Sequence, residues 1–272
     1  MSSGRWGTHA IEMTGDRVIK RFPRKDGGRA EREWRALSLL ATYAPGLAPE
    51  PREADLAAVE PVVVMSRLAG APLRGAAVEG KKIEALAEAV TTLFEAVPSD
   101  VVSKIPLRPG HRGELIGHLD EWAVTVRPQA GGPVRQAMDA GLDWLARSGP
   151  GADVRGEVSP VFGPGDGNLA NYLWDGLRVQ VVDFEDSGRS DRAFELAEIT
   201  EHVGSWVEHP FDVSAFLEHF ALSPAETARL RESRRLLALV WLFLLASEAT
   251  EHPRNPPGTA ERQADRVLEL LA

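Results

Sequence analysis

The chain changes its pattern of hydrophobic and polar residues near residue 70. Before that point, short runs rich in β-branched residues are separated by turn signals such as Thr14-Gly15-Asp16, and such runs predict strands. One segment in this region has the three- and four-residue apolar spacing of a helix. The predicted strands are 9–13, 17–22 and 58–65, and the predicted helix is 29–43.

The rest of the chain is mainly helical, because apolar residues recur at three- and four-residue intervals. The predicted helices are 78–97, 112–126, 133–147, 193–208, 223–247 and 258–271. The longest apolar run, 236–246, is well short of the roughly 20 residues that a membrane-spanning helix needs, so it indicates a helix buried in the core. Only 159–182 breaks the helical pattern. The sequence therefore predicts an α+β fold, with a small sheet followed by a larger helical region.

Composition narrows the classes of function. None of the 272 residues is Cys, which excludes disulfides and thiolate metal sites and favours a reducing cytoplasm. The amino terminus has no apolar core of a secretory signal. The formal net charge is −9 and no tract is rich in Lys and Arg, which argues against nucleic acid or an anionic membrane as a partner. The acidity suits a cationic substrate, and ordinary solubility explains it equally well.

The segment 159–185 contains the most informative residues. An apolar run leads to Asp166, Asn171 follows five residues later, and two short strands joined by Asp175-Gly176 end at Asp183. A loop followed by a hairpin brings these polar side chains to one end. Phosphoryl transfer requires such a set, because one carboxylate orients the attacking hydroxyl and other oxygens hold Mg²⁺ against the phosphates. Asp166 and Asn171 alone are typical turn residues, and the hairpin spacing to Asp183 favours the chemical interpretation.

This segment resembles the catalytic segment of the aminoglycoside phosphotransferase family. The likeness rests on Gly165-Asp166-x-x-x-x-Asn171, on Val181-Val182-Asp183-Phe184-Glu185 and on the continuation at 188–197. The resemblance implies a bilobed protein-kinase-like fold, with a nucleotide-binding lobe at 1–67 and a helical lobe at 68–272. It also implies Asp166 as the catalytic base, Asn171 and Asp183 as Mg²⁺ ligands, and ATP, or alternatively GTP, as the phosphate donor.

The acceptor implied by the resemblance is a hydroxyl of a small molecule, and an aminoglycoside, a sugar and an amino alcohol such as choline all remain open. A protein acceptor is disfavoured, because only 11 residues separate Asp183 from Glu195. No obligate protein partner is indicated. Candidate acceptor contacts are acidic or aromatic residues that follow the metal aspartate, and a solvated helix face is the alternative. These candidates are Glu185, Glu195, Glu198 and Trp206.

A lysine and a glutamate of the first lobe are predicted to form a pair. Lys20 ends the second predicted strand. Glu33 shares a helix face with Leu37 and Leu40, whereas Glu31 lies about 200° away around the helix. A carboxylate on the buried face requires a partner, and Lys20 is the candidate. The resemblance implies the same pair, with Lys20 on the nucleotide phosphates.

The segment after the third predicted strand resembles the hinge of the same family. The resemblance implies that backbone groups of Met65, Ser66, Arg67 and Leu68 contact the nucleotide base. A plain linker between lobes, located within 66–72, is compatible with the same geometry.

Three features depart from the family pattern. Pro164 replaces the histidine that precedes Gly-Asp, and proline cannot hydrogen-bond through its side chain. Glu195 replaces an aspartate. Only 19 residues precede Lys20, so Gly4 and Gly7 would have to form any phosphate-covering loop. These departures support the alternative that the chain is a catalytically degenerate nucleotide- or ligand-binding protein.

The histidines show no metal-ligand spacing, so we expect them at the surface or satisfied locally. They are residues 9, 111, 118, 202, 209, 219 and 252.

Overall fold

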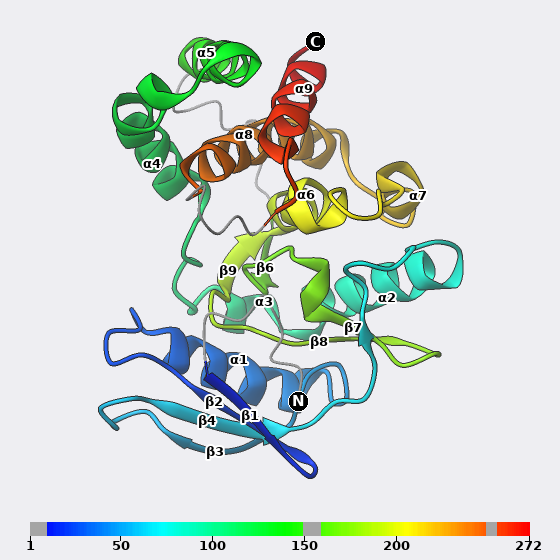
Figure 1. Cartoon of the computed structure of the whole chain (residues 1–272). Coiled ribbons are helices and arrows are strands. Elements are labelled where there is room, and N and C mark those ends of the chain that lie inside the picture. The colour runs from blue at the N-terminus through cyan, green and yellow to red at the C-terminus, as the bar shows by residue number, and fades with distance from the viewer. Residues whose placement is uncertain (1–9, 149–158, 249–254) are drawn as a thin grey trace.

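The computed structural model describes residues 10–148, 159–248 and 255–272. A small antiparallel sheet with one long helix lies beside a larger, mainly helical part (Figure 1). The mixed α+β architecture predicted from the sequence is therefore confirmed. Gly4, Gly7, His9 and His252 lie outside the described residues, and so do the interpretations that concern them.

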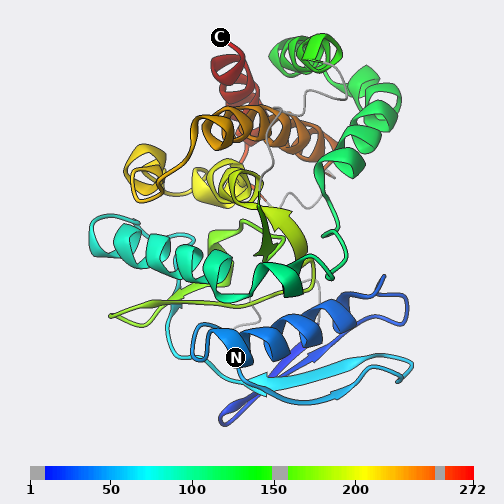
Figure 2. The ribbon, with the colours of Figure 1, turned by 180° about the vertical axis from the view of Figure 1, so that it is seen from behind.

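The sheet of the first lobe has four antiparallel strands in the order β1-β2-β4-β3. The first two form the predicted hairpin around Gly15. Helix α1 lies between the sheet and the helical part in both views (Figure 1 and Figure 2), and its fully buried Leu37 and Leu40 belong to the same core as Val63 of β4. The bounds are β1 (Ala10–Thr14), β2 (Arg17–Arg21), α1 (Arg29–Tyr43), β3 (Pro51–Asp55) and β4 (Val62–Ser66).

Strand β3 was not predicted. It is an edge strand with the sequence PREAD, and most of its side chains are exposed, so it lacks the alternation that identifies a half-buried strand. The strand predicted at 58–65 begins only at Val62, because the residues before it form a turn.

The helical part surrounds two small sheets, one of order β5-β7-β8 and one pairing β6 with β9. The predicted apolar helix is buried as expected, with Leu236 and Leu239 fully inaccessible. Helical elements are α2 (Lys81–Ala96), α3 (Ser99–Val102), α4 (Arg112–Thr125), η1 (Arg127–Gln129), α5 (Gly132–Ser148), η2 (Leu169–Asn171), α6 (Arg192–Glu201), η3 (Val203–Ser205), α7 (Val213–Leu217), α8 (Pro224–Ser247) and α9 (Thr259–Leu271). The strands are β5 (Ala71–Pro72), β6 (Pro160–Gly163), β7 (Tyr172–Trp174), β8 (Val179–Val181) and β9 (Gly188–Asp191).

The helix predicted at 193–208 was too long. It ends at Glu201, because His202 has an extended backbone (ψ 135°) and its imidazole accepts a hydrogen bond from the Gly204 amide. Helix α6 is fixed to α8 and α9 by the fully buried Glu201, whose carboxylate oxygens contact Arg234 Nε at 2.5 Å and Arg266 Nε at 2.6 Å.

The chain passes from β4 to β5 through residues 67–70, within the predicted boundary. The division into lobes at 1–67 and 68–272 stays a prediction. Among the described residues, no helix combines the length and the hydropathy needed to cross a bilayer.

Candidate active site

Lys20 of β2 and Glu33 of α1 are in direct contact, with Lys20 Nζ 3.1 Å from Glu33 Oε2. Both side chains are almost inaccessible, at 5% and 1% exposure. Antiparallel pairing places Lys20 opposite Val63, and α1 covers that face of the sheet. The alignment of Glu33 with Leu37 and Leu40, which is visible in the sequence, is what turns the carboxylate inward.

Two more carboxylates surround the same ammonium group. Asp183 Oδ1 lies 2.5 Å and Glu185 Oε2 lies 2.8 Å from Lys20 Nζ. Burial alone would lower the pKa of Lys20, but the three carboxylates outweigh burial and raise that pKa above its ordinary value. Burial also raises the pKa of Glu33, to about 7, and the charge of Lys20 opposes this effect. Lys20 is thus a buried cation in contact with three carboxylates.

The backbone at Asp183 is unusual. Its φ of 69° makes it the one non-glycine residue with a positive φ in the part of the chain that the structure describes. Such a conformation costs free energy and occurs mainly at functional sites. It is held in place because the amide of Phe184 donates to Glu33 Oε2 at 2.8 Å, and the Phe184 ring is buried beside Phe162. The Asp183 side chain remains 39% exposed.

Asp166 lies at the start of a loop that its own carboxylate organises. The amide of Asn168 donates to Oδ1 at 2.9 Å, and Asn171 Nδ2 donates to Oδ2 at 3.0 Å. Desolvation raises the pKa of Asp166 to about 6, assisted by the nearby charge of Asp183 and opposed by these two hydrogen bonds. An aspartate with this pKa is ionised at neutral pH and can still accept a proton, as a general base must.

The loop and the end of β8 are joined directly. The amide of Val182 donates to the carbonyl of Asn171 at 2.9 Å, which places Asn171 beside the residue that precedes Asp183. The structure thus brings Lys20, Glu33, Asp166, Asn171 and Asp183 into one region, and the role predicted for each of them stays a prediction.

No group of three His, Asp or Glu side chains is arranged to enclose a metal within the described ranges. Mg²⁺ does not require such a group at a nucleotide site, because phosphates and waters complete its octahedral shell. With its amide nitrogen directed at Asp166, Asn171 retains its side-chain oxygen, and Asp183 contributes carboxylate oxygens. This donor set fits one Mg²⁺ bound together with phosphates.

Arg108, which sequence reasoning missed, supports the loop that carries Asp166. Its Nη2 donates to the carbonyl of Gly165 at 2.6 Å, and its Nη1 lies 3.0 Å from Glu195 Oε1 and 2.9 Å from Glu198 Oε1. The amide of Gly165 in turn lies 3.4 Å from Glu195 Oε2. No local motif identifies Arg108, since it lies in an irregular segment more than 50 residues before the loop.

These contacts change the interpretation of the predicted acceptor residues. Glu195 is 1% exposed and bound to Arg108, and Glu198 is buried beside it, with a pKa raised to about 7 by desolvation. Glu185 contacts Lys20. The indole of Trp206 lies under the Arg262 guanidinium at 5.3 Å. We therefore assign Glu195 and Glu198 to the support of the loop, and the predicted contact of these four residues with an acceptor stays a prediction.

His202 was expected at the surface or satisfied locally, and the structure shows it satisfied locally and close to Asp166. It is buried, with Nε2 3.6 Å from Asp166 Oδ1, and its ring packs edge-on against Trp241 at 4.5 Å. Burial lowers its pKa to about 3, so the imidazole is neutral. Nδ1 accepts from Gly204, which places the proton on Nε2. Residues 195, 198 and 202 are three and four positions apart, so the helical period places His202 on the same face as Glu195 and Glu198.

In the predicted hinge, the amide of Ser66 donates to the carbonyl of Glu50 at 2.9 Å, and the amide of Arg67 donates to the carbonyl of Asp16 at 2.7 Å. Any contact of this segment with a nucleotide base therefore falls to its carbonyls or to the remaining amides, including that of Leu68. Met65 is buried within β4.

The site combines the buried Lys20–Glu33 pair beside a small antiparallel sheet with a loop that carries Asp166 and with Asp183, whose carboxylate can bind a metal. This combination is typical of a kinase-like phosphotransferase. The family model described as the phosphotransferase enzyme family matches residues 9–233. The chain therefore belongs to this family, which confirms the resemblance found in the sequence and the enzyme class that it implied.

Solved structures with the same fold include a choline/ethanolamine kinase family protein from Mesorhizobium loti, with a TM-score of 0.62 and 20% identity over 98% of this chain and 86% of that one. A thermostable mutant of aminoglycoside phosphotransferase APH(4)-Ia has a TM-score of 0.66 and 18% identity over 96% and 88%. It was also solved with AMP-PNP and hygromycin B. Choline kinase LicA from Streptococcus pneumoniae has a TM-score of 0.62 and 16% identity over 99% and 91%. No curated protein matched the sequence.

Proposed function

We propose that this protein transfers the γ-phosphate of ATP to a hydroxyl group of a small molecule. The observation that carries the proposal is the convergence in one region of a buried Lys20–Glu33 pair, the candidate metal ligands Asn171 and Asp183, and Asp166 with a pKa of about 6. Family membership supports the same reaction.

Each residue has a distinct role in the proposed reaction. Lys20, held by Glu33, binds the α- and β-phosphates. Asn171 and Asp183 hold Mg²⁺, which neutralises charge on the phosphates when it is bound. Asp166 orients the acceptor hydroxyl and takes its proton as the oxygen forms a bond to the γ-phosphorus and the bond to ADP breaks.

The chemical class of the acceptor is proposed from the structural relatives. Structural relatives are named as kinases of choline and of aminoglycosides, and one was solved with hygromycin B. We propose an aminosugar or an amino alcohol, with ATP favoured over GTP and with the cytoplasm as the site of the reaction. The rival proposal of a catalytically degenerate binding protein is disfavoured, because Glu195, which replaces the usual aspartate, binds Arg108, and Arg108 also holds the Gly165 carbonyl next to Asp166.

The test is a panel assay on the purified protein with ATP and Mg²⁺. Hygromycin B, streptomycin, gentamicin, spectinomycin, choline and ethanolamine are each added, and ADP release is followed together with ³¹P NMR of the product. The proposal predicts acceptor-dependent ADP formation and a phosphomonoester signal for at least one member. Tight binding of Mg·ATP without transfer to any member would instead support the degenerate alternative.

A further inference from the structure

Arg108 holds the residue directly before the proposed base. Its guanidinium donates to the Gly165 carbonyl and contacts Glu195 and Glu198, while its Nε donates to the carbonyl of Pro109 at 3.0 Å. The side chain is only 4% exposed, and its guanidinium carbon lies 5.3 Å from the centroid of the Phe194 ring. A planar guanidinium can bind three such groups at once, which a lysine ammonium cannot do with the same geometry.

The backbone of Arg108 is itself fixed against strand β9, which follows Asp183 in the chain. Its amide donates to the carbonyl of Arg189 at 3.2 Å, and the amide of Arg189 donates to the carbonyl of Pro106 at 2.9 Å. A Cβ on Gly188 would lie 2.7 Å from Arg108 Cα, so only glycine allows the two segments to approach so closely. These backbone contacts therefore fix the position from which the Arg108 side chain extends.

The backbone of the loop at Gly165 is fixed by side chains from outside the loop. Gly165 has a φ of 88°, and a Cβ there would lie 2.0 Å from the carbonyl oxygen of Asp186. Its neighbour Pro164 has neither an amide proton nor a polar side chain to fix the loop. The Gly165 carbonyl and amide are instead bound by Arg108 and Glu195, from two other parts of the chain.

We propose that Arg108 is a positioning residue for Asp166: through the Gly165 carbonyl and through Glu195 it fixes the loop that a side chain at position 164 cannot fix in this protein. Only the expected fall in kcat rests on the proposed function. The structural consequence, an ordered loop, can be measured without nucleotide or acceptor.

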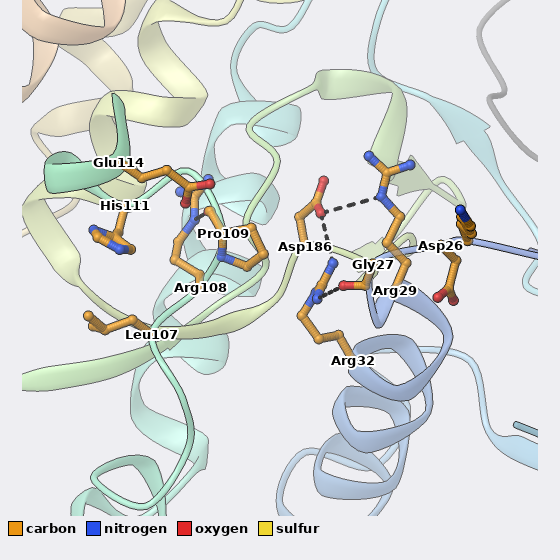
Figure 3. A pocket seen from close by; sticks show the side chains of 11 residues that line it. Asp26, Gly27, Arg29, Arg32, Leu107, Arg108, Pro109, His111, Glu114 and Asp186 are labelled. Carbon is orange, nitrogen blue, oxygen red and sulfur yellow. Dashed lines mark hydrogen bonds and ion pairs between the residues drawn. The ribbon is translucent and has the colours of Figure 1, made fainter. Parts of the chain in front are cut away.

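The site of Arg108 can be reached from solvent. It borders a cleft of about 590 Å³ between the first turn of α1 and the start of α4. In Figure 3, Arg29 and Arg32 approach Asp186 on one side of this cleft, and Arg108, His111 and Glu114 lie on the other. A small cation added to a truncated variant can therefore diffuse to the place that the Arg108 guanidinium leaves.

The experiment compares Arg108→Ala, Arg108→Lys and Arg266→Ala. Arg266 is a matched control, because it also binds a buried carboxylate, that of Glu201, but lies on α9. Amide hydrogen exchange at 165–171 is measured on the free protein, and kcat and KM for ATP are measured with the acceptor found in the panel. Each Arg108 variant is then assayed with millimolar guanidinium chloride.

We expect faster exchange at 165–171 in both Arg108 variants but not in Arg266→Ala. We expect kcat to fall by about 10²-fold, the usual scale for a misplaced catalytic group, with the KM for ATP nearly unchanged. Guanidinium should restore part of kcat in Arg108→Ala alone. If Arg108→Ala does not fold, Arg108→Lys decides, since it keeps a cation for both glutamates. Wild-type exchange and kcat in a folded Arg108 variant would overturn the proposal, whereas an inactive wild type with normal loop protection would count against the proposed function alone.

Discussion

Lys20 Nζ lies 2.5 Å from Asp183 Oδ1, although the two residues are 163 positions apart in the chain. Lys20 is proposed to bind phosphates and Asp183 to bind Mg²⁺, and in the free protein Asp183 shares the charge of Lys20 with Glu33 and Glu185. Binding of Mg·ATP must replace this ion pair with two new ones, one from Lys20 to phosphate and one from Asp183 to metal.

Asp183→Asn tests the metal role. The amide keeps the shape of the side chain but removes the charge that attracts Mg²⁺, so we expect Mg²⁺-dependent ATP binding to be lost while the fold survives. Isothermal titration with ATP, with and without Mg²⁺, measures the effect, and circular dichroism checks the fold. Mg·ATP affinity equal to that of the wild type would exclude Asp183 as a ligand.

Glu33→Ala tests the pair with Lys20. Since Glu33 holds both Lys20 Nζ and the Phe184 amide, its loss should lower kcat/KM for ATP, and Lys20→Ala should add little further. The interaction free energy from the double-variant cycle is expected to be about 0.5–3 kcal/mol. Glu31→Ala is the control, because Glu31 is exposed on the same helix and should leave kcat/KM unchanged. Equal effects of the two substitutions would contradict the pairing.

The raised pKa of Asp166, about 6, predicts a pH dependence. The general base must be deprotonated, so kcat/KM should fall at least tenfold per pH unit below this pKa. It should level off only above about pH 7, because Glu33 and Glu198, whose pKa values are raised to about 7, titrate in the same range. His202 stays neutral throughout, because burial lowers its pKa to about 3, and it adds no second inflection near neutrality. A pH–rate profile from about pH 5 to 8 measures this, and a flat profile over that range would show that Asp166 does not control the rate.

Leu239→Ala tests the core of the helical lobe. Leu239 is fully buried on α8, and its truncation should lower the free energy of unfolding by about 2–5 kcal/mol. Leu244, on the same helix, is 37% exposed, and Leu244→Ala should cost less than half as much. Urea unfolding of the two variants provides the comparison. Equal losses would mean that α8 is not packed as described.

The parts of the site that were predictable are encoded locally. Asp166, Asn171 and Asp183 lie within one loop and hairpin, so their spacing in the sequence determines their spacing in the fold. Glu33 could be paired with Lys20 because the helical period placed it on a buried face, where a carboxylate requires a partner.

The parts that were missed depend on contacts between distant segments. Arg108 and Glu195 are 87 residues apart, and no local pattern indicates that they meet. The contact of Glu195 with Arg108 was missed for the same reason, since its face of α6 is covered by a segment without regular structure. Strand β3 was not predicted because edge strands do not need an apolar face.

The claim that Asp166 is the base of a phosphotransferase is tested most directly by Asp166→Asn. The amide oxygen can still accept from the Asn168 amide, although the hydrogen bond from Asn171 Nδ2 to the second oxygen is lost, so the loop and the affinity for Mg·ATP should be largely retained. Single-turnover transfer from γ-³²P-ATP to the acceptor found in the panel should slow by on the order of 10²–10⁴. Unchanged ATP affinity with transfer reduced on this scale is the predicted result. A variant that transfers phosphate at more than about a third of the wild-type rate would contradict the assignment, since a positioned base contributes far more than that.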